Sequence, residues 1–222
     1  CERVSAAYWA EPFNAVSNVA FIIAAIYGWK AMKARGGSDW PERIVILLAG
    51  IVGIGSFQFH TFANGWSELA DLIPIWTFVA AYVLLAIYRA SDENISRTIT
   101  TTLFIVAAVG LSLWLKPSAD PTTIATPPPL NGSLLYVPAV VCLVFFTVLS
   151  FMKGMATRFY MLGATAVFLI SLTFRTVDMM TCTSTIIGTH FIWHTLNGVM
   201  IGLLLLSLVK HMPPKSFSKQ AL

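Results

Sequence analysis

The sequence predicts an all-α integral membrane protein, a seven-transmembrane helix bundle, from three observations. Hydrophobic residues make up 57% of the 222 residues and charged residues only 11%, about half the charge that a soluble domain usually carries. The mean hydropathy is +0.76, and apolar stretches of about 20 residues, long enough to cross a bilayer as a helix, recur along the chain. Since lipid offers no partners to backbone N–H and C=O groups, these stretches are expected to be helical.

Seven stretches have the length and composition of a membrane span, and together they predict one domain over residues 1–222. Residues 1–11 are expected to precede the bundle on its outer side, and residues 211–222 to form a cytoplasmic tail. Residues 116–131 hold five prolines, which predicts an extended, non-helical linker between the fourth and fifth spans. The spans are expected over residues 12–33, 41–62, 68–89, 97–116, 132–152, 157–177 and 188–210.

The basic residues predict the orientation of the bundle. Eleven of the 14 Lys and Arg residues fall on the loops and tail of one side of the predicted spans, and only Arg3, Lys116 and Arg175 on the other. The positive-inside rule then places the N-terminus outside and the C-terminus in the cytoplasm. This topology and attraction to anionic headgroups account for the net charge of +4, so no nucleic-acid partner is predicted.

Three of the four histidines fall inside the predicted spans, where ionisable residues are costly and therefore point to function. His60 lies near the outer end of the second span, and His190 and His194 lie in the first turns of the seventh. The last two are four residues apart and share one helix face. All three are therefore expected at the same depth, whereas His211 belongs to the tail.

A hydroxyl and two carboxylates are expected at this same level. Ser56 precedes His60 by one turn, Asp71 opens the third span and Asp178 closes the sixth. Three imidazoles with a free fourth position are typical of catalytic zinc, although other first-row metals bind such a set. The alternative is that each histidine only forms hydrogen bonds between helices.

Several stretches resemble a known family. They are WAEPFNAVSN, GSFQFH, ELADLIPIW, FRTVD and GTHFIWHTLNG, and they are similar to the alkaline ceramidases and their bacterial relatives. That family is part of a wider superfamily of membrane hydrolases that includes the adiponectin and progestin receptors. The specific pattern is a serine four residues before the first histidine, an aspartate eleven after it, and H-x-x-x-H in the last helix.

The resemblance implies a seven-helix, zinc-dependent hydrolase that cleaves the amide bond of ceramide to a sphingoid base and a fatty acid. By position, His60, His190 and His194 would be the zinc ligands. Asp71 would be the proton shuttle, and Ser56 would contact the catalytic water or the oxyanion. Asp178 would support a ligand or pack between helices, unless it forms a salt bridge with Arg175 at the membrane surface.

The resemblance also implies a calcium site and a disulfide. Glu2 and Glu11 match calcium ligands of the family, while Val4 offers only its carbonyl and the remaining ligands would precede Cys1. The alternative is that both glutamates are simply exposed. Cys1 and Cys182 match a family disulfide between the N-terminal segment and the loop after the sixth span, which leaves Cys142 as a free thiol.

Other functions remain open at this stage. Other acylated lipids are alternative substrates, because few bacteria make sphingolipids and the resemblance is to the bacterial branch. That branch implies a bacterial inner membrane, with the site on its periplasmic side. A receptor with residual hydrolase chemistry and a metal transporter are two further alternatives. The short tails disfavour the receptor, and the absence of a repeat disfavours the transporter. The sequence does not predict an oligomeric state.

Overall fold

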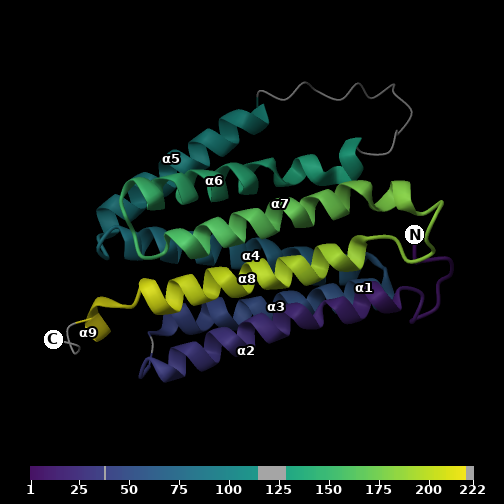
Figure 1. Ribbon diagram of the computed structural model, residues 1–222, viewed down its shortest axis with the longest axis horizontal. Coiled ribbons are helices and arrows are strands. Elements are labelled where there is room, and N and C mark those ends of the chain that lie inside the picture. Colours follow the sequence, from purple (N-terminus) through teal and green to yellow (C-terminus); the bar gives the residue numbers. More distant parts are fainter. Residues whose placement is uncertain (38, 115–128, 219–222) are drawn as a thin grey trace.

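The computed structural model describes residues 1–37, 39–114 and 129–218, and their regular elements are all helices (Figure 1). The N-terminal half contains α1 (Pro12–Ser17), α2 (Val19–Ala34), α3 (Trp40–Phe62), α4 (Gly65–Ala90) and α5 (Ile95–Trp114). The C-terminal half contains the 3-10 helix η1 (Pro129–Tyr136), α6 (Val137–Met152), α7 (Arg158–Thr181), α8 (His190–His211) and the short α9 (Lys215–Ser218).

Six stretches of the described chain are long and apolar enough to cross a membrane, so the protein is a multi-pass membrane protein. They are Pro12–Ala34, Trp40–Phe62, Gly65–Ala90, Leu130–Met152, Arg158–Thr181 and His190–His211. The sequence predicts a seventh span at 97–116. There the structure contains α5, whose apolar part among the residues searched is the shorter stretch Ile95–Ala107.

Two predicted elements differ in detail from those observed. The first span is divided into α1 and α2 at Asn18, whose side-chain Nδ2 donates hydrogen bonds to the carbonyls of Asn14 and Ala15. Most of the predicted proline-rich linker lies outside the described residues. Its last residues belong to η1, where Leu130 and Asn131 have positive φ angles and turn the chain into α6.

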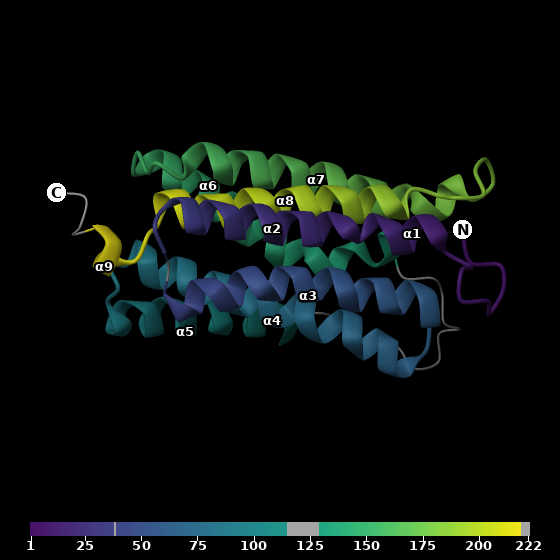
Figure 2. The ribbon, with the colours of Figure 1, turned by 90° about the horizontal axis from the view of Figure 1, so that it is seen from below.

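The helices form two layers, visible in Figure 2. α3, α4 and α5 lie in one layer, and α2, α8, α7 and α6 lie in the other, with contacts between α2 and α3 joining them. α8 packs against both α2 and α7 and has 56% of its apolar stretch buried, the largest share of the six. The last helix is therefore the centre of the bundle, and its first turns carry two of the three histidines.

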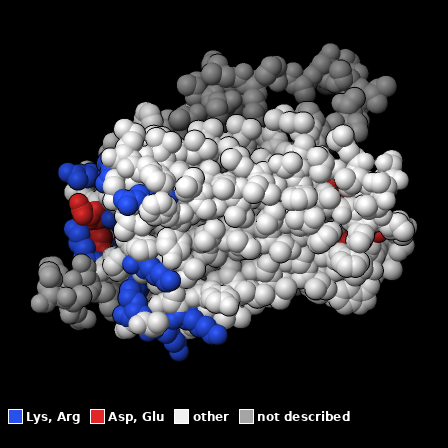
Figure 3. All heavy atoms as spheres, in the orientation of Figure 1, with Lys and Arg blue, Asp and Glu red and all other residues white. Residues whose placement is uncertain are grey.

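Ion pairs tie the helices together at the end of the bundle where the basic residues gather, which we call the basic end (Figure 3). Arg35 pairs with the fully buried Glu42 at 2.6 Å and donates to the carbonyl of Val209 at 2.7 Å, which links α2, α3 and α8. Arg89 on α4 pairs with Asp39 at 2.6 Å. We call the opposite end, where His60, His190 and His194 lie, the histidine end.

Close packing of α3 on α4 depends on Gly55 and Pro74. Pro74 has no N–H to donate to the carbonyl of Ala70 one turn earlier, so this carbonyl loses its helical partner. Gly55 faces it, and a Cβ on Gly55 would lie only 1.9 Å from the Ala70 oxygen. The absence of a side chain therefore lets α3 approach α4 at the position where Ser56 follows Gly55 and Asp71 follows Ala70.

We predict that Gly55→Ala separates α3 from α4 and destabilises the fold, because the added methyl group collides with backbone that cannot move aside. The free energy of unfolding should fall by about 1–3 kcal/mol, the usual cost of overpacking, as measured by thermal unfolding of the protein in detergent. Gly50→Ala is the matched control on the same helix, since its Cβ would meet Ala25 at an ordinary 3.6 Å. Equal stability of the two variants would contradict the packing argument.

Candidate metal centre

Three imidazoles from two helices converge at the histidine end. The ring centroid of His60 on α3 lies 4.7 Å from that of His194 and 5.4 Å from that of His190, and the two α8 rings are 4.5 Å apart. One ring nitrogen of each lies within 4.8 Å of the others. Zinc–nitrogen bonds of about 2.0–2.1 Å in a tetrahedral site require a separation of about 3.3 Å, so small side-chain movements would complete the site.

Glu11 fixes the tautomer of His60. Its carboxylate oxygen lies 2.5 Å from Nδ1 of His60, and since a carboxylate only accepts, Nδ1 carries the proton. Burial raises the pKa of Glu11, but the hydrogen bonds from His60, Arg3 and Asn14 outweigh it, so this pKa lies well below the usual range of a carboxyl. Glu11 is therefore an anion at physiological pH, and Nε2 of His60 is left free to bind a metal.

The first turn of the bundle fixes the tautomer of His194 in the same way. Nδ1 of His194 lies 3.1 Å from the carbonyl oxygen of Asn14, which can only accept, so this nitrogen also carries the proton. The Ser17 hydroxyl lies 3.1 Å from the same nitrogen and donates to the same carbonyl at 2.8 Å. Metal-binding histidines are commonly oriented by such partners, so the donor set fits a metal ion held through Nε2.

Ser56 and Asp71 form a pair on the neighbouring wall. Ser56 is 4% exposed, and its side chain lies close to that of Asp71. One Asp71 oxygen, Oδ1, is buried and has no hydrogen-bond partner among the described residues. A buried carboxylate oxygen without a partner can accept a proton from a bound molecule, which suits a residue that works on water.

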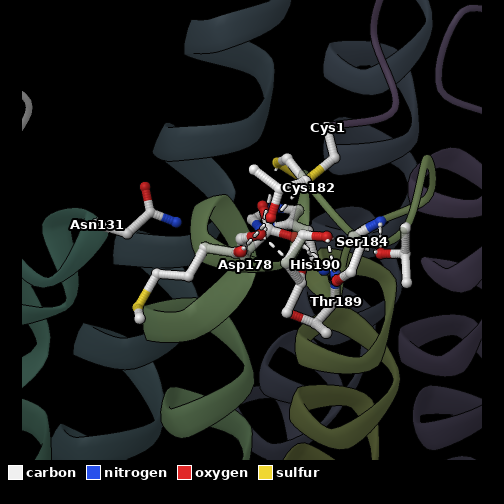
Figure 4. Close-up of a disulfide and its surroundings, with 12 residues drawn as sticks. Cys1, Asn131, Asp178, Cys182, Ser184, Thr189 and His190 are labelled. Carbon is white, nitrogen blue, oxygen red and sulfur yellow. Dashed lines mark hydrogen bonds between the residues drawn. A yellow bond between two sulfur atoms is a disulfide. The ribbon is translucent and has the colours of Figure 1, made fainter.

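Asp178 holds the start of α8. Its Oδ1 accepts hydrogen bonds from the backbone N–H groups of Thr189 at 2.6 Å and His190 at 3.0 Å (Figure 4). These are donors that a helix start leaves without helical partners. In the described part of the chain Asp178 forms no ion pair with Arg175. It is therefore a positioning residue for the two histidines of α8.

A disulfide between Cys1 and Cys182 fastens the N-terminal segment beside Asp178 (Figure 4). Gly188 makes room for it, because its φ is +67° and a Cβ there would lie 2.8 Å from the Cys1 sulfur. Cys142 is free. The bond holds the segment that supplies Glu11, Asn14 and Ser17 against the histidine end.

The two glutamates of the N-terminal segment are not simply exposed. Glu2 is 8% exposed, and its oxygens accept hydrogen bonds from the backbone N–H groups of Phe13 at 2.6 Å and Asn14 at 3.0 Å. Glu11 pairs with Arg3 and with His60. The contact with His60 is absent from the predictions above, as are the contacts of Asn14 and Ser17 with His194. The only signal in the sequence is the polar run E-P-F-N-A-V-S-N at the start of an apolar span.

We predict that Glu11→Gln weakens zinc binding about 10- to 100-fold, the usual effect of removing a partner of a ligating histidine. The amide keeps the size of the side chain but loses the charge that favours the Nδ1–H tautomer of His60. Chelator competition would measure the affinity, with the exposed Glu68 of α4, changed to Gln, as the control at the same end of the bundle. Unchanged affinity in Glu11→Gln would show that Glu11 does not orient His60.

Comparison with known proteins agrees with this geometry. A search of curated proteins finds no match. A family model described as Ceramidase matches residues 1–216, which include the three histidines, Ser56, Asp71, Asp178 and both cysteines of the disulfide. The match covers nearly the whole chain, and on this ground the protein belongs to the ceramidase family.

Proposed function

We propose that the protein is a zinc-dependent hydrolase that cleaves the amide bond of an N-acyl lipid within the membrane, with ceramide as the first candidate. The main support for the proposal is a cluster of three imidazoles that could hold a metal ion, in a chain of the ceramidase family. Asp71 at the same end of the bundle adds a buried carboxylate oxygen without a hydrogen-bond partner among the described residues. Other acylated lipids are the alternative substrates, since the family assigns lipid amide hydrolysis but not this chain's own substrate.

The residues of the site have distinct roles in this proposal. His60, His190 and His194 would hold the metal, which when bound supplies a Lewis acid that activates water and polarises the carbonyl. Asp71 would accept the proton from the attacking water at Oδ1 and later deliver it to the leaving amine. Ser56 would donate its hydroxyl hydrogen to the carbonyl oxygen as negative charge develops there. Glu11, Asn14 and Asp178 would keep the imidazoles in place.

We also propose the full topology: seven spans including α5, the N-terminus outside and the C-terminus cytoplasmic. Lys and Arg gather at the basic end, where α9 lies, in support of this orientation (Figures 1 and 3). The histidine end would then face the periplasm of a bacterial inner membrane. An oxidising compartment on that side is consistent with a disulfide there.

A calcium ion at Glu2 and Glu11 is a separate proposal. Hydrogen bonds from Asn14 to both glutamates bring the two carboxylates to the first turn of α1, and carboxylate oxygens are the ligands that calcium prefers. Elemental analysis of protein that was never exposed to chelator would test it. We expect calcium as well as zinc, with calcium lost in Glu2→Gln; zinc alone would count against the site.

We predict that Asp71→Ala retains zinc but loses about 10²- to 10⁴-fold in turnover, the usual contribution of a general acid–base. Zinc content and fatty-acid release would be measured on the same preparation. Asp92→Asn, at an exposed turn between α4 and α5, serves as the control. Wild-type turnover in Asp71→Ala would remove Asp71 from the mechanism.

The function itself is tested by fatty-acid release, measured by mass spectrometry, from ceramides and from other N-acyl and O-acyl lipids. We expect release by the wild-type protein and none by His194→Ala. Release from another lipid, and not from ceramide, would keep the zinc hydrolase and change its substrate. Bound metal without release from any lipid would favour the receptor-like alternative, and metal lost on dialysis would favour transport.

A further inference from the structure

Arg175 is a cationic side chain of the histidine end that the proposed mechanism does not use. It lies on α7, one turn before Asp178, and its guanidinium carbon is 5.2 Å from the ring centroid of Tyr136 and 5.3 Å from that of Trp193. Contacts with two aromatic rings stabilise the cation and fix its plane. The side chain is therefore held in place from η1 and α8 as well as from its own helix.

Among the described residues, no ion pair neutralises the charge of Arg175. No carboxylate of these residues lies within salt-bridge distance of it, and its Nε is buried without a hydrogen-bond partner. Asp178, the partner that the sequence suggests, accepts hydrogen bonds from the backbone of α8 instead. Asp71 likewise forms no ion pair with the guanidinium in the part of the chain that the structure describes, and its Oδ1 has no hydrogen-bond partner there. A half-buried guanidinium that contacts aromatic rings and has no carboxylate beside it favours an anionic ligand.

Arg175 lies at the level of the three histidines. Its guanidinium carbon is 5.3 Å from the ring centroid of Trp193, the residue that precedes His194 on α8. Since α7 and α8 are consecutive and antiparallel, and Asp178 bonds to the backbone of His190, the residue one turn before Asp178 lies level with the first two turns of α8. η1 covers it from the side, with Gly132 near its Nη2. An anion at Arg175 would therefore be close to the scissile amide.

We propose that Arg175 binds an anionic group of the lipid substrate, a carboxylate or phosphate a few bonds from the scissile amide nitrogen, as in an N-acyl amino acid. This inference rests on the proposed amide hydrolysis and, among its candidate substrates, favours an anionic N-acyl lipid over ceramide, which carries no charged group. Arginine suits the task because its planar fork donates two parallel hydrogen bonds to one carboxylate or phosphate. The same fork could hold the carboxylate of the released fatty acid, so the experiment must separate these two sources.

The test compares N-palmitoylglycine with N-palmitoylethanolamine in the zinc-loaded, full-length protein. These lipids share the acyl chain and amide and differ in whether a carboxylate or an alcohol follows. We expect the wild type to prefer the glycine lipid in kcat/KM by about tenfold or more, which corresponds to one charged hydrogen bond. Arg175→Gln should abolish this preference while cleavage of the ethanolamine lipid changes little, and Arg175→Lys should keep part of it. Arg158→Gln is the matched control, because Arg158 also lies over an aromatic ring of α7, at its other end.

Binding provides a second measurement that does not depend on turnover. Quenching of tryptophan fluorescence would report binding of N-palmitoylglycine and of palmitate to the protein and to Arg175→Gln. If the wild type releases fatty acid from neither lipid and from no ceramide, the proposed function fails, whereas Arg175-dependent binding of the glycine lipid would still support the anion site. Equal loss on both lipids in Arg175→Gln, or no preference in the wild type, would overturn the proposal. If palmitate binds as tightly as the glycine lipid, and its binding depends equally on Arg175, then Arg175 binds the fatty-acid product and the proposal is overturned.

Discussion

The ring nitrogens of the histidines must find their partners inside the protein, because the helices that carry the histidines are surrounded by lipid. A neutral imidazole has two nitrogens, and only one of them can face a metal. The other needs an acceptor, and lipid has none to offer. The chain meets this requirement with residues from its own beginning: Glu11 for His60, and the carbonyl of Asn14 for His194. Much of the remaining architecture serves to keep that short segment in contact with the last helix.

Three kinds of feature hold the residues of the site in position: a break between helices, close helix packing and ion pairs. Asn18 interrupts the first span, so that α1 is a separate short helix next to both α3 and α8. The missing side chain at Gly55 and the missing N–H at Pro74 bring Ser56 and Asp71 together on α3 and α4. Ion pairs at the basic end fasten the same helices at their far ends. The three histidines are thus placed on rigid elements that are fixed at both ends, the arrangement that preorganised sites require.

The sequence alone predicts the helices and the meeting of the three histidines, because hydropathy and the four-residue spacing of His190 and His194 depend only on local geometry. Glu11, the partner of His60, could not be predicted, since residues 1–11 have no periodicity to show where their side chains point. Asp178 shows a second limit. Either Arg175 or backbone N–H groups could bind this carboxylate. The turn at Gly188 brings the backbone within hydrogen-bond distance of it, and the backbone N–H groups form the bonds. The break at Asn18 is a similar case, because no proline or glycine marks it.

The disulfide between Cys1 and Cys182 joins positions 181 residues apart. It therefore imposes an order on biogenesis. Ribosomes make proteins from the N-terminus, so the first residues leave the ribosome long before their partner and must wait, unattached, while α2 to α7 enter the membrane. Only when Cys182 has been made and has reached the same side of the membrane can the bond close, and α8 with its two histidines follows directly. A truncated or stalled chain that lacks the last helices consequently has neither the covalent ring nor the cluster of three histidines.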